Sequence, residues 1–251
     1  MKHLRIAFDR RGFLGLAAGA AASAAAAAPT AAFAAAGGDA QLKIATIGAG
    51  HEGGALGTLF AKQGHPVMFS SRHPDELKEL VASAGPTAQA GTIEQAVQFG
   101  DVILLVVPYT AVDEIGKDYG KALAAKPLVI DVSNPIARRD GDAIVSWVSE
   151  QGGAGLATAK LLPGAHLVRG FNAINFLKLT ADAHRSGEPL GIPIASDDPK
   201  AEALASKLIR EIGFEPAPVG GLAMGKYLVP GTPLAGEHTP SEIQKIVATL
   251  K

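Results

Sequence analysis

The 251-residue chain contains no cysteine. This absence excludes a disulfide framework, a metal–thiolate site and a thiol nucleophile, and it is compatible with either redox compartment. The formal net charge is only −1, so the sequence lacks the basic surface of a nucleic-acid-binding protein and the acidic tail of a disordered one. The seven histidines are scattered singly, and the chain has no zinc-type spacing, P-loop or G-x-S-x-G motif. We therefore expect neither a metal site nor a partner nucleic acid.

Glycine, by contrast, is abundant, and three of the 30 glycines occur at the G-x-G-x-x-G spacing: Gly48, Gly50 and Gly53. The apolar run 42–47 before them predicts a buried parallel strand, and a helix is expected to begin near Glu52 or Gly53. Gly64 and His65 end that helical pattern, and residues 66–69 predict a second strand. This is a βαβ unit of about 30 residues, the context that a dinucleotide-binding turn requires. The alternative is a glycine-rich turn in another α/β protein.

Each of the three glycines has a mechanical reason to be in such a turn. Gly48 allows the tight turn out of the strand, Gly50 lets the backbone approach a pyrophosphate, and Gly53 lets the helix pack closely on the sheet. The free N–H groups and the positive end of the helix dipole then favour the phosphates. The residues expected to line this part of a cofactor site are Gly48, Ala49, Gly50, His51, Glu52 and Gly53. Glu52 is an acid inside a phosphate turn, so we expect its side chain to point to solvent.

The end of the second strand indicates which dinucleotide binds. An NAD site usually has an acidic residue there, whereas this chain has Ser70, Ser71 and Arg72. A carboxylate would repel a 2′-phosphate, but hydroxyl groups and a guanidinium bind it through charge-assisted hydrogen bonds. The sequence therefore predicts NADP(H) rather than NAD(H). The alternative is a solvated Ser-Arg turn.

Three segments together resemble a known family: IGAGHEGGALG (47–57), GHPVMFSSR (64–72) and DVILLVVP (101–108). They are similar to NADP-dependent oxidoreductases that work with the deazaflavin coenzyme F-420. That amino-terminal domain is also shared with pyrroline-carboxylate reductases and the cytosolic domain of six-helix metalloreductases. The resemblance is clearest over residues 42–135. It implies that the glycine turn binds the pyrophosphate and that Ser71 and Arg72 bind the 2′-phosphate.

Further candidates follow the later strands, which are expected at 102–107, 127–132 and 166–171. In an open α/β sheet, ligands bind outside the carboxyl ends of the strands. The residues expected at this rim are Val107, Pro108, Tyr109, Asn134 and Asn172. The resemblance implies that the first three lie near the ribose–nicotinamide half and that Asn172 approaches the cofactor. For Tyr109 a simple strand-ending role stays equally open, and for Asp131 a structural role is favoured.

The chain divides into three segments in this interpretation. Residues 1–36 carry Arg10 and Arg11, an alanine-rich run and small-residue cleavage sites, and they resemble a twin-arginine signal peptide cleaved after Ala34 or Ala36. The alternative is an uncleaved membrane anchor. Residues 41–219 predict an α/β, Rossmann-type, doubly wound and mostly parallel sheet, and residues 220–251 a small C-terminal helical extension. We expect export to the periplasm by the twin-arginine machinery.

The chemistry expected is hydride transfer, because a nicotinamide supplies the reactivity and the protein supplies orientation and a dry pocket. No Lys, His or acidic pair is evident at the rim, which favours a deazaflavin, flavin or similar small redox acceptor over a hydroxy acid or imine. Only about 30 residues follow the last predicted strand, too few for the helical domain of hydroxyacid dehydrogenases and pyrroline-carboxylate reductases. The alternatives are electron transfer to ferric or cupric ions and a non-catalytic NADP-binding module. A homodimer stays open.

Overall fold

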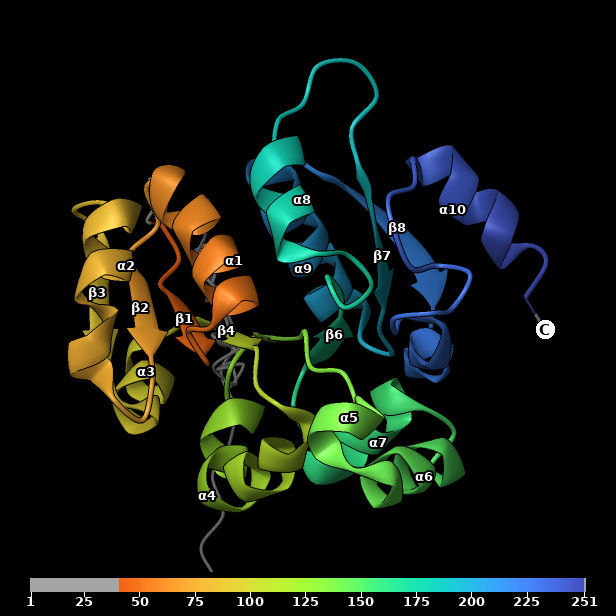
Figure 1. The fold of residues 1–251 in the computed structure, drawn as a ribbon, viewed down its shortest axis with the longest axis horizontal. Helices are drawn as coiled ribbons and strands as arrows, with labels where there is room; N and C mark the ends of the chain where they lie inside the picture. Colours follow the sequence, from red (N-terminus) through yellow and green to blue (C-terminus); the bar gives the residue numbers. More distant parts are fainter. Residues whose placement is uncertain (1–40, 251) are drawn as a thin grey trace, which may run out of the picture. The chain divides into compact units, whose positions relative to one another are not determined.

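The computed structural model describes residues 41–250 and forms a Rossmann-type α/β fold (Figure 1). One eight-stranded sheet has the order β3-β2-β1-β4-β5-β6-β7-β8. The first six strands are parallel, whereas β7 is antiparallel to β6 and parallel to β8. The strands are β1 (Ile44–Ile47), β2 (Val67–Ser70), β3 (Ala88–Gly91), β4 (Val102–Leu105), β5 (Leu128–Asp131), β6 (Leu167–Arg169), β7 (Gly191–Ala195) and β8 (Glu215–Gly220). The predicted doubly wound, mostly parallel sheet is confirmed.

Helices cover both faces of the sheet, which explains why β1, β4 and β5 are buried along their whole length. Successive strand residues supply opposite cores: Ile44 packs with one and Ala45 with the other. The first core includes α1 (His51–Lys62), α2 (Lys78–Ala84), α8 (Phe176–Asp182) and α9 (Pro199–Glu211). The second includes α3 (Ile93–Phe99), α4 (Val112–Ala124), α6 (Asp142–Glu150) and α7 (Ala154–Leu161).

Side-chain caps fix where four of the described helices begin. Thr92 and Gln95 form a capping box at α3, and the Asn175 and Asp198 side chains accept from the first backbone N–H groups of α8 and α9. Thr239 and Glu242 form a second capping box at α10 (Pro240–Val247). These local bonds satisfy donors that the helices themselves leave unpaired.

Strand β7 contains Pro193, which has no backbone N–H to donate. The strand lies between β6 and β8, and β8 is the edge. The missing proline N–H is tolerated because β6 and β7 pair only at Arg169 and Ala195. In the other pairing, a bulge-like irregularity lies next to the proline, where the register with β8 shifts between Ile194 and Ala195.

The C-terminal segment covers the β7–β8 end of the sheet. The helical extension predicted there consists of the 3₁₀ helix η3 (Leu222–Tyr227) and α10. The remaining short elements are η1 (Pro74–Leu77), η2 (Tyr109–Ala111) and α5 (Ala137–Asp140). Within the described part of the chain, every helix is too short or too polar to cross a membrane. The predicted signal peptide lies outside the described residues.

Candidate nucleotide-binding site

The glycine turn joins β1 to α1, and its three glycines are needed for two different reasons. Gly48 has φ +98°, and a Cβ atom there would lie 2.2 Å from the Val106 carbonyl oxygen. A Cβ atom on Gly53 would lie 2.1 Å from the Gly48 carbonyl oxygen. Gly50 has an ordinary φ of −72°, and its Cβ would meet nothing within 4 Å. Packing therefore requires Gly48 and Gly53, whereas Gly50 faces open space of the kind that a diphosphate approaching the backbone would occupy.

Helix α1 starts at this opening, one residue earlier than the earlier of the two expected starts. Gly50 is its N-cap, and no side chain caps it. An uncapped helix N-terminus presents its first N–H groups and the positive end of its dipole to an anion. The turn thus has the electrostatic form of a phosphate site.

Two cavities adjoin along the turn and share Gly50, Val106, Val107 and Pro108. The first, of about 820 Å³, contains Arg72 and is called the Arg72 cavity below. The second, of about 580 Å³, contains Glu52 and is called the Glu52 cavity. They lie at the carboxyl ends of β1 and β4, where the strand order reverses and where open α/β sheets bind ligands. The pair suits an extended ligand that crosses the turn at Gly50.

The three predicted phosphate-binding residues all line the Arg72 cavity, but their side chains differ in availability. The buried Ser70 hydroxyl donates to the Thr46 carbonyl oxygen at 2.7 Å, so it belongs to the sheet. The Ser71 hydroxyl accepts from the backbone N–H of His73 at 3.0 Å. Arg72 is exposed and forms neither an ion pair nor a hydrogen bond within residues 41–250. Its guanidinium is therefore open to an anionic ligand.

Carboxylates also line the Arg72 cavity. Glu76 follows the Ser-Arg pair, and Glu114 and Asp118 come from α4 on the other side. They leave Arg72 as the single cation among the residues that form this cavity. A phosphate bound here depends on that side chain, because the surrounding carboxylates oppose it.

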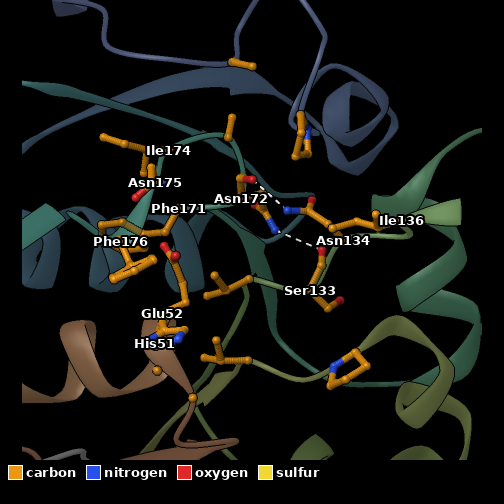
Figure 2. A pocket seen from close by; sticks show the side chains of 18 of the residues that line it. His51, Glu52, Ser133, Asn134, Ile136, Phe171, Asn172, Ile174, Asn175 and Phe176 are labelled. Atoms are coloured by element: carbon orange, nitrogen blue, oxygen red, sulfur yellow. Dashed lines mark hydrogen bonds between the residues drawn. The ribbon is translucent and has the colours of Figure 1, made fainter. Parts of the chain in front are cut away.

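The Glu52 cavity contains four of the residues predicted at the rim: Val107, Pro108, Asn134 and Asn172. The two asparagines hold the ends of β5 and β6 together (Figure 2). The Asn134 amide donates to the Asn172 carbonyl oxygen at 2.7 Å, and the Asn172 amide donates to the Asp131 and Ser133 carbonyl oxygens at 2.9 and 3.2 Å. The Asn172 side-chain oxygen is buried without a partner in the described structure. Asn172 thus retains an unused acceptor beside the cavity.

Tyr109 requires a correction, because it lines neither cavity. Its ring is buried beneath η2, and its hydroxyl bonds to the Ala154 carbonyl oxygen and to Thr158 on α7 at 3.3 and 3.1 Å. Burial raises the pKa of its phenol to about 12. Tyr109 therefore joins η2 to α7, and β4 ends earlier, at Leu105.

Glu52 requires the second correction. The side chain was expected in solvent, but it is partly buried and points into the cavity toward Phe171 and Phe176 (Figure 2). Its Oε1 atom is buried and has no hydrogen-bond partner in residues 41–250. Burial raises the pKa of this carboxyl to about 7, and a backbone hydrogen bond with Phe176 opposes the rise. The neighbouring His51 ring stacks on Phe176 with centroids 4.8 Å apart, so the start of α1 is held against α8.

Two arginines at the site were not predicted. Arg169 is fully buried at the end of β6 and lies beside Asp131, its partner in the strand register. Arg139 lines the Glu52 cavity and donates to the Asn134 carbonyl oxygen and the Asp140 carboxylate. The sequence does contain a signal for the buried pair. Asp131 and Arg169 are an acidic and a basic residue, and each is the last residue of one of two consecutive buried strands. The structural role favoured for Asp131 is confirmed.

Comparison with known proteins agrees with this geometry. Residues 43–135 match the family described as NADP oxidoreductase, coenzyme F420-dependent. That match spans the glycine turn and the first five strands. It covers the part of the chain that forms the Arg72 cavity and about half of the Glu52 cavity.

Individual relatives extend beyond the matched domain. The structure of hypothetical protein SMa0349 from Sinorhizobium meliloti superposes with a TM-score of 0.67 at 25% identity, covering 79% of this chain and 95% of that one. Metalloreductase STEAP3 from Rattus norvegicus is 26% identical over 73% of this chain. A glycerol-3-phosphate dehydrogenase [NAD(P)+] from Staphylococcus epidermidis is 27% identical over 45% of this chain. The matched parts make up only 35% and 39% of those two proteins, so the chain spans little more than a third of their length.

Proposed function

We propose that this protein is an NADP(H)-dependent oxidoreductase that transfers hydride between NADPH and a small acceptor of the deazaflavin or flavin type. The observation that carries the proposal is the open space at Gly50, which lies where the Arg72 cavity and the Glu52 cavity meet above an uncapped helix N-terminus. The matched family and the named reductase and dehydrogenase relatives support the same class of chemistry.

The residues present fit such a dinucleotide. The backbone of the glycine turn and the start of α1 would hold the diphosphate, and Ser71 and Arg72 would hold the 2′-phosphate. The nicotinamide half would then lie in the Glu52 cavity, which Val107, Pro108 and Asn172 line. Bound there, NADPH supplies a hydride, and the protein supplies orientation and shelter from water.

The walls of the Glu52 cavity suit a planar acceptor. Apolar groups come from three separate segments, including Val107, Ile136 and Ile174, and they limit the access of water to the reacting atoms. Arg139 lies on the same cavity wall, but its guanidinium is already paired with the Asp140 carboxylate and bonded to the Asn134 carbonyl oxygen. The apolar groups, and not this cation, are therefore what suits the flat ring of a deazaflavin or flavin.

There are two alternatives to this hydride-transfer function. The likeness to a metalloreductase over 73% of the chain favours electron transfer through a flavin to ferric or cupric ions. In this alternative the metal ion is the electron acceptor, and residues 41–250 contain no cluster of three or more His, Asp or Glu side chains able to hold a metal. A non-catalytic NADP-binding module is the third possibility.

Oxidation of NADPH by the purified mature protein separates these functions. Coenzyme F-420, FMN and FMN with ferric citrate serve as acceptors, and binding of NADP⁺ is measured in parallel. Turnover with coenzyme F-420 or FMN alone supports the proposal. Turnover that requires ferric citrate supports the metalloreductase function. Tight NADP⁺ binding without turnover on any acceptor contradicts both and favours the binding module.

We also propose export by the twin-arginine machinery, which rests on the sequence of residues 1–36. The expected result is a periplasmic product shortened at Ala34 or Ala36. Replacement of Arg10 and Arg11 by lysine should retain the full-length chain in the cytoplasm, as cell fractionation and mass spectrometry would show. Equal export of the variant would exclude this route.

A further inference from the structure

We infer that Glu52 is a proton donor: it holds a proton on its carboxyl group in the nucleotide-loaded protein and delivers it to the acceptor in the Glu52 cavity. This inference rests on the proposed function and adds to it the class of acceptor, namely one with a conjugated C=N group that takes up a proton together with a hydride.

The position of Glu52 is the first argument. It is the second residue of α1, next to the open space at Gly50, and its side chain enters the cavity that holds the candidate nicotinamide site. The phosphate turn and the acid therefore share one backbone segment. A ligand bound to the turn lies within the same cavity system as the carboxyl group (Figure 2).

The state of the carboxyl oxygens is the second argument. Oε1 is buried and receives no hydrogen bond from residues 41–250, although a carboxylate oxygen in such a place requires a donor. A protonated carboxyl relieves this deficit, because the acid form requires fewer hydrogen-bond donors than a carboxylate. The geometry thus favours the acid form of a side chain that lines the cavity proposed for the acceptor.

The charge environment is the third argument. Burial already brings the pKa of Glu52 to about 7, and only the backbone hydrogen bond with Phe176 lowers it. A dinucleotide diphosphate bound at the adjoining turn adds negative charge and raises the pKa further. The ionisable groups on the helices at and against the start of α1 are His51 on α1, Lys178 and Asp182 on α8, and the exposed Lys78 and Glu79 on α2. The wall of the cavity adds Arg139 with its partner Asp140, and the ion pair of Asp131 with Arg169 lies behind that wall.

Those neighbours leave Glu52 without a cationic partner. The two carboxylates Asp131 and Asp140 are paired with Arg169 and Arg139, and Lys178 is paired with Glu237. Glu52 forms no ion pair in the part of the chain that the structure describes. Binding of an anionic nucleotide is therefore expected to be accompanied by uptake of a proton at this residue.

The proton completes the balance of the reaction. The hydride forms a bond to one end of the conjugated C=N system, the π bond breaks, and its electron pair moves to nitrogen. That nitrogen takes the proton from Glu52, which is left as a carboxylate and regains a proton from solvent. The acceptor is reduced by two electrons, and the dihydronicotinamide is oxidised by two. Flavins, deazaflavins and imines belong to this class, whereas ferric and cupric ions need no proton.

A binding measurement tests the first half of the inference without any turnover. NADP⁺ is titrated calorimetrically at pH 8 in two buffers of different ionisation enthalpy, which gives the number of protons taken up. The wild type should take up on the order of one proton, because a carboxyl near pKa 7 is mostly ionised before binding. Glu52→Gln should take up none, and Glu79→Gln, an exposed acid on α2 outside both cavities, should match the wild type. Equal uptake by the wild type and Glu52→Gln would overturn the inference.

Turnover tests the second half. With NADPH and FMN, Glu52→Gln should lower kcat by roughly 10²–10⁴-fold with little change in the KM for NADPH. The decline in rate at high pH that we expect of the wild type should be absent from this variant. An unchanged kcat and pH profile would overturn the proton delivery, while turnover by the wild type would still support the proposed function. A wild type that binds NADP⁺ but reduces no acceptor contradicts the proposed function and the delivery together.

A check on folding accompanies both measurements. If Glu52→Gln has a Tm well below that of the wild type, Glu52→Ala is assayed with added formate, a small acid that fits the space of the lost carboxyl. Recovery of rate with formate supports the inference, and recovery is not expected for a residue that acts only in packing. The absence of any recovery in a folded, NADPH-binding variant counts against it.

Discussion

The guanidinium of Arg169 lies 2.7 Å from the Asp131 carboxylate, and both side chains are buried, with exposures of 0% and 1%. The two residues are register partners at the ends of β5 and β6. The second guanidinium nitrogen donates to the Asn134 side-chain oxygen at 2.9 Å, and Asp131 accepts from the Ser133 hydroxyl. This buried pair therefore holds the loop after β5 at the wall of the Glu52 cavity.

Removing one partner of this pair should be strongly destabilising. Arg169→Met leaves the Asp131 carboxylate buried without its cation, and we expect a loss of about 3–5 kcal/mol in the free energy of unfolding. Urea denaturation measures it. The matched control is the double variant with Asp131→Leu, which removes both charges and should lose much less. Equal losses in the single and double variants would show that packing, and not charge, makes this site important.

Arg72→Ala tests the preference for NADP(H). Because Arg72 is the single cation lining its cavity, its removal should cost roughly 1.5–3 kcal/mol of NADP(H) affinity, or about ten- to 150-fold in Kd. NAD(H), which has no 2′-phosphate, should bind almost as before. Calorimetry or fluorescence titration gives both constants, with exposed Arg138→Ala as the control. Equal losses for both nucleotides would contradict the assignment of Arg72 to the 2′-phosphate.

Two alanine variants separate the functional from the structural glycines. Gly50→Ala places its methyl group in open space, so the fold should keep its Tm while the affinity for NADP⁺ falls by at least about tenfold, or 1.4 kcal/mol. Gly53→Ala pushes a methyl group against the Gly48 carbonyl and should lower stability by about 1–3 kcal/mol or more. Thermal unfolding and nucleotide titration distinguish them. A Gly50→Ala protein with unchanged affinity would mean that the diphosphate binds elsewhere.

Tyr109→Phe tests whether Tyr109 has a structural role outside the cofactor site. The variant loses the hydroxyl that bonds Ala154 and Thr158, so stability should fall by about 0.5–1.5 kcal/mol. The affinity for NADPH should not change, because the ring lies outside both cavities. Chemical denaturation and nucleotide titration of the same preparation give the two values. A large loss of NADPH affinity with unchanged stability would show that Tyr109 does contribute to the cofactor site.

The ionisation of Glu52 should make stability depend on pH. Its folded-state pKa of about 7 lies above the ordinary value of 4.5, so the folded protein binds the proton more tightly than the unfolded chain. The stabilisation from this group is complete below pH 4.5 and is lost as pH rises to 7 and beyond. Relative to Glu52→Gln, the wild type should lose on the order of 1–2 kcal/mol between pH 4.5 and 8, with the magnitude reduced by partial exposure. If the free energy of unfolding, measured by urea denaturation, depends on pH in the same way for the wild type and Glu52→Gln, the raised pKa is contradicted.

The sequence was sufficient for the local elements of the nucleotide-binding half. The apolar runs that end at Ile47 and Leu105 predict buried strands because only a sheet covered on both faces accommodates them. Gly48 and Gly53 could be recognised from their spacing, although only the clash that Gly53 avoids, with the Gly48 carbonyl oxygen, is local in the chain. The clash that Gly48 avoids is with Val106, which only the folded sheet brings close. Arg72 could be recognised because it lies two residues after the end of β2, and strand ends share one edge of a parallel sheet.

The burial and the partners of the side chains around the Glu52 cavity depend on the tertiary structure. Glu52 is buried because α8, more than 120 residues later, packs against the start of α1 and brings Phe176 over it. Arg169 pairs with Asp131 only because β6 lies beside β5. Tyr109 lies outside both cavities because α7 provides the hydrogen-bond partners of its hydroxyl group. Spacing along the chain determines which backbone groups turn toward a phosphate, whereas burial and pKa depend on segments that meet only after folding.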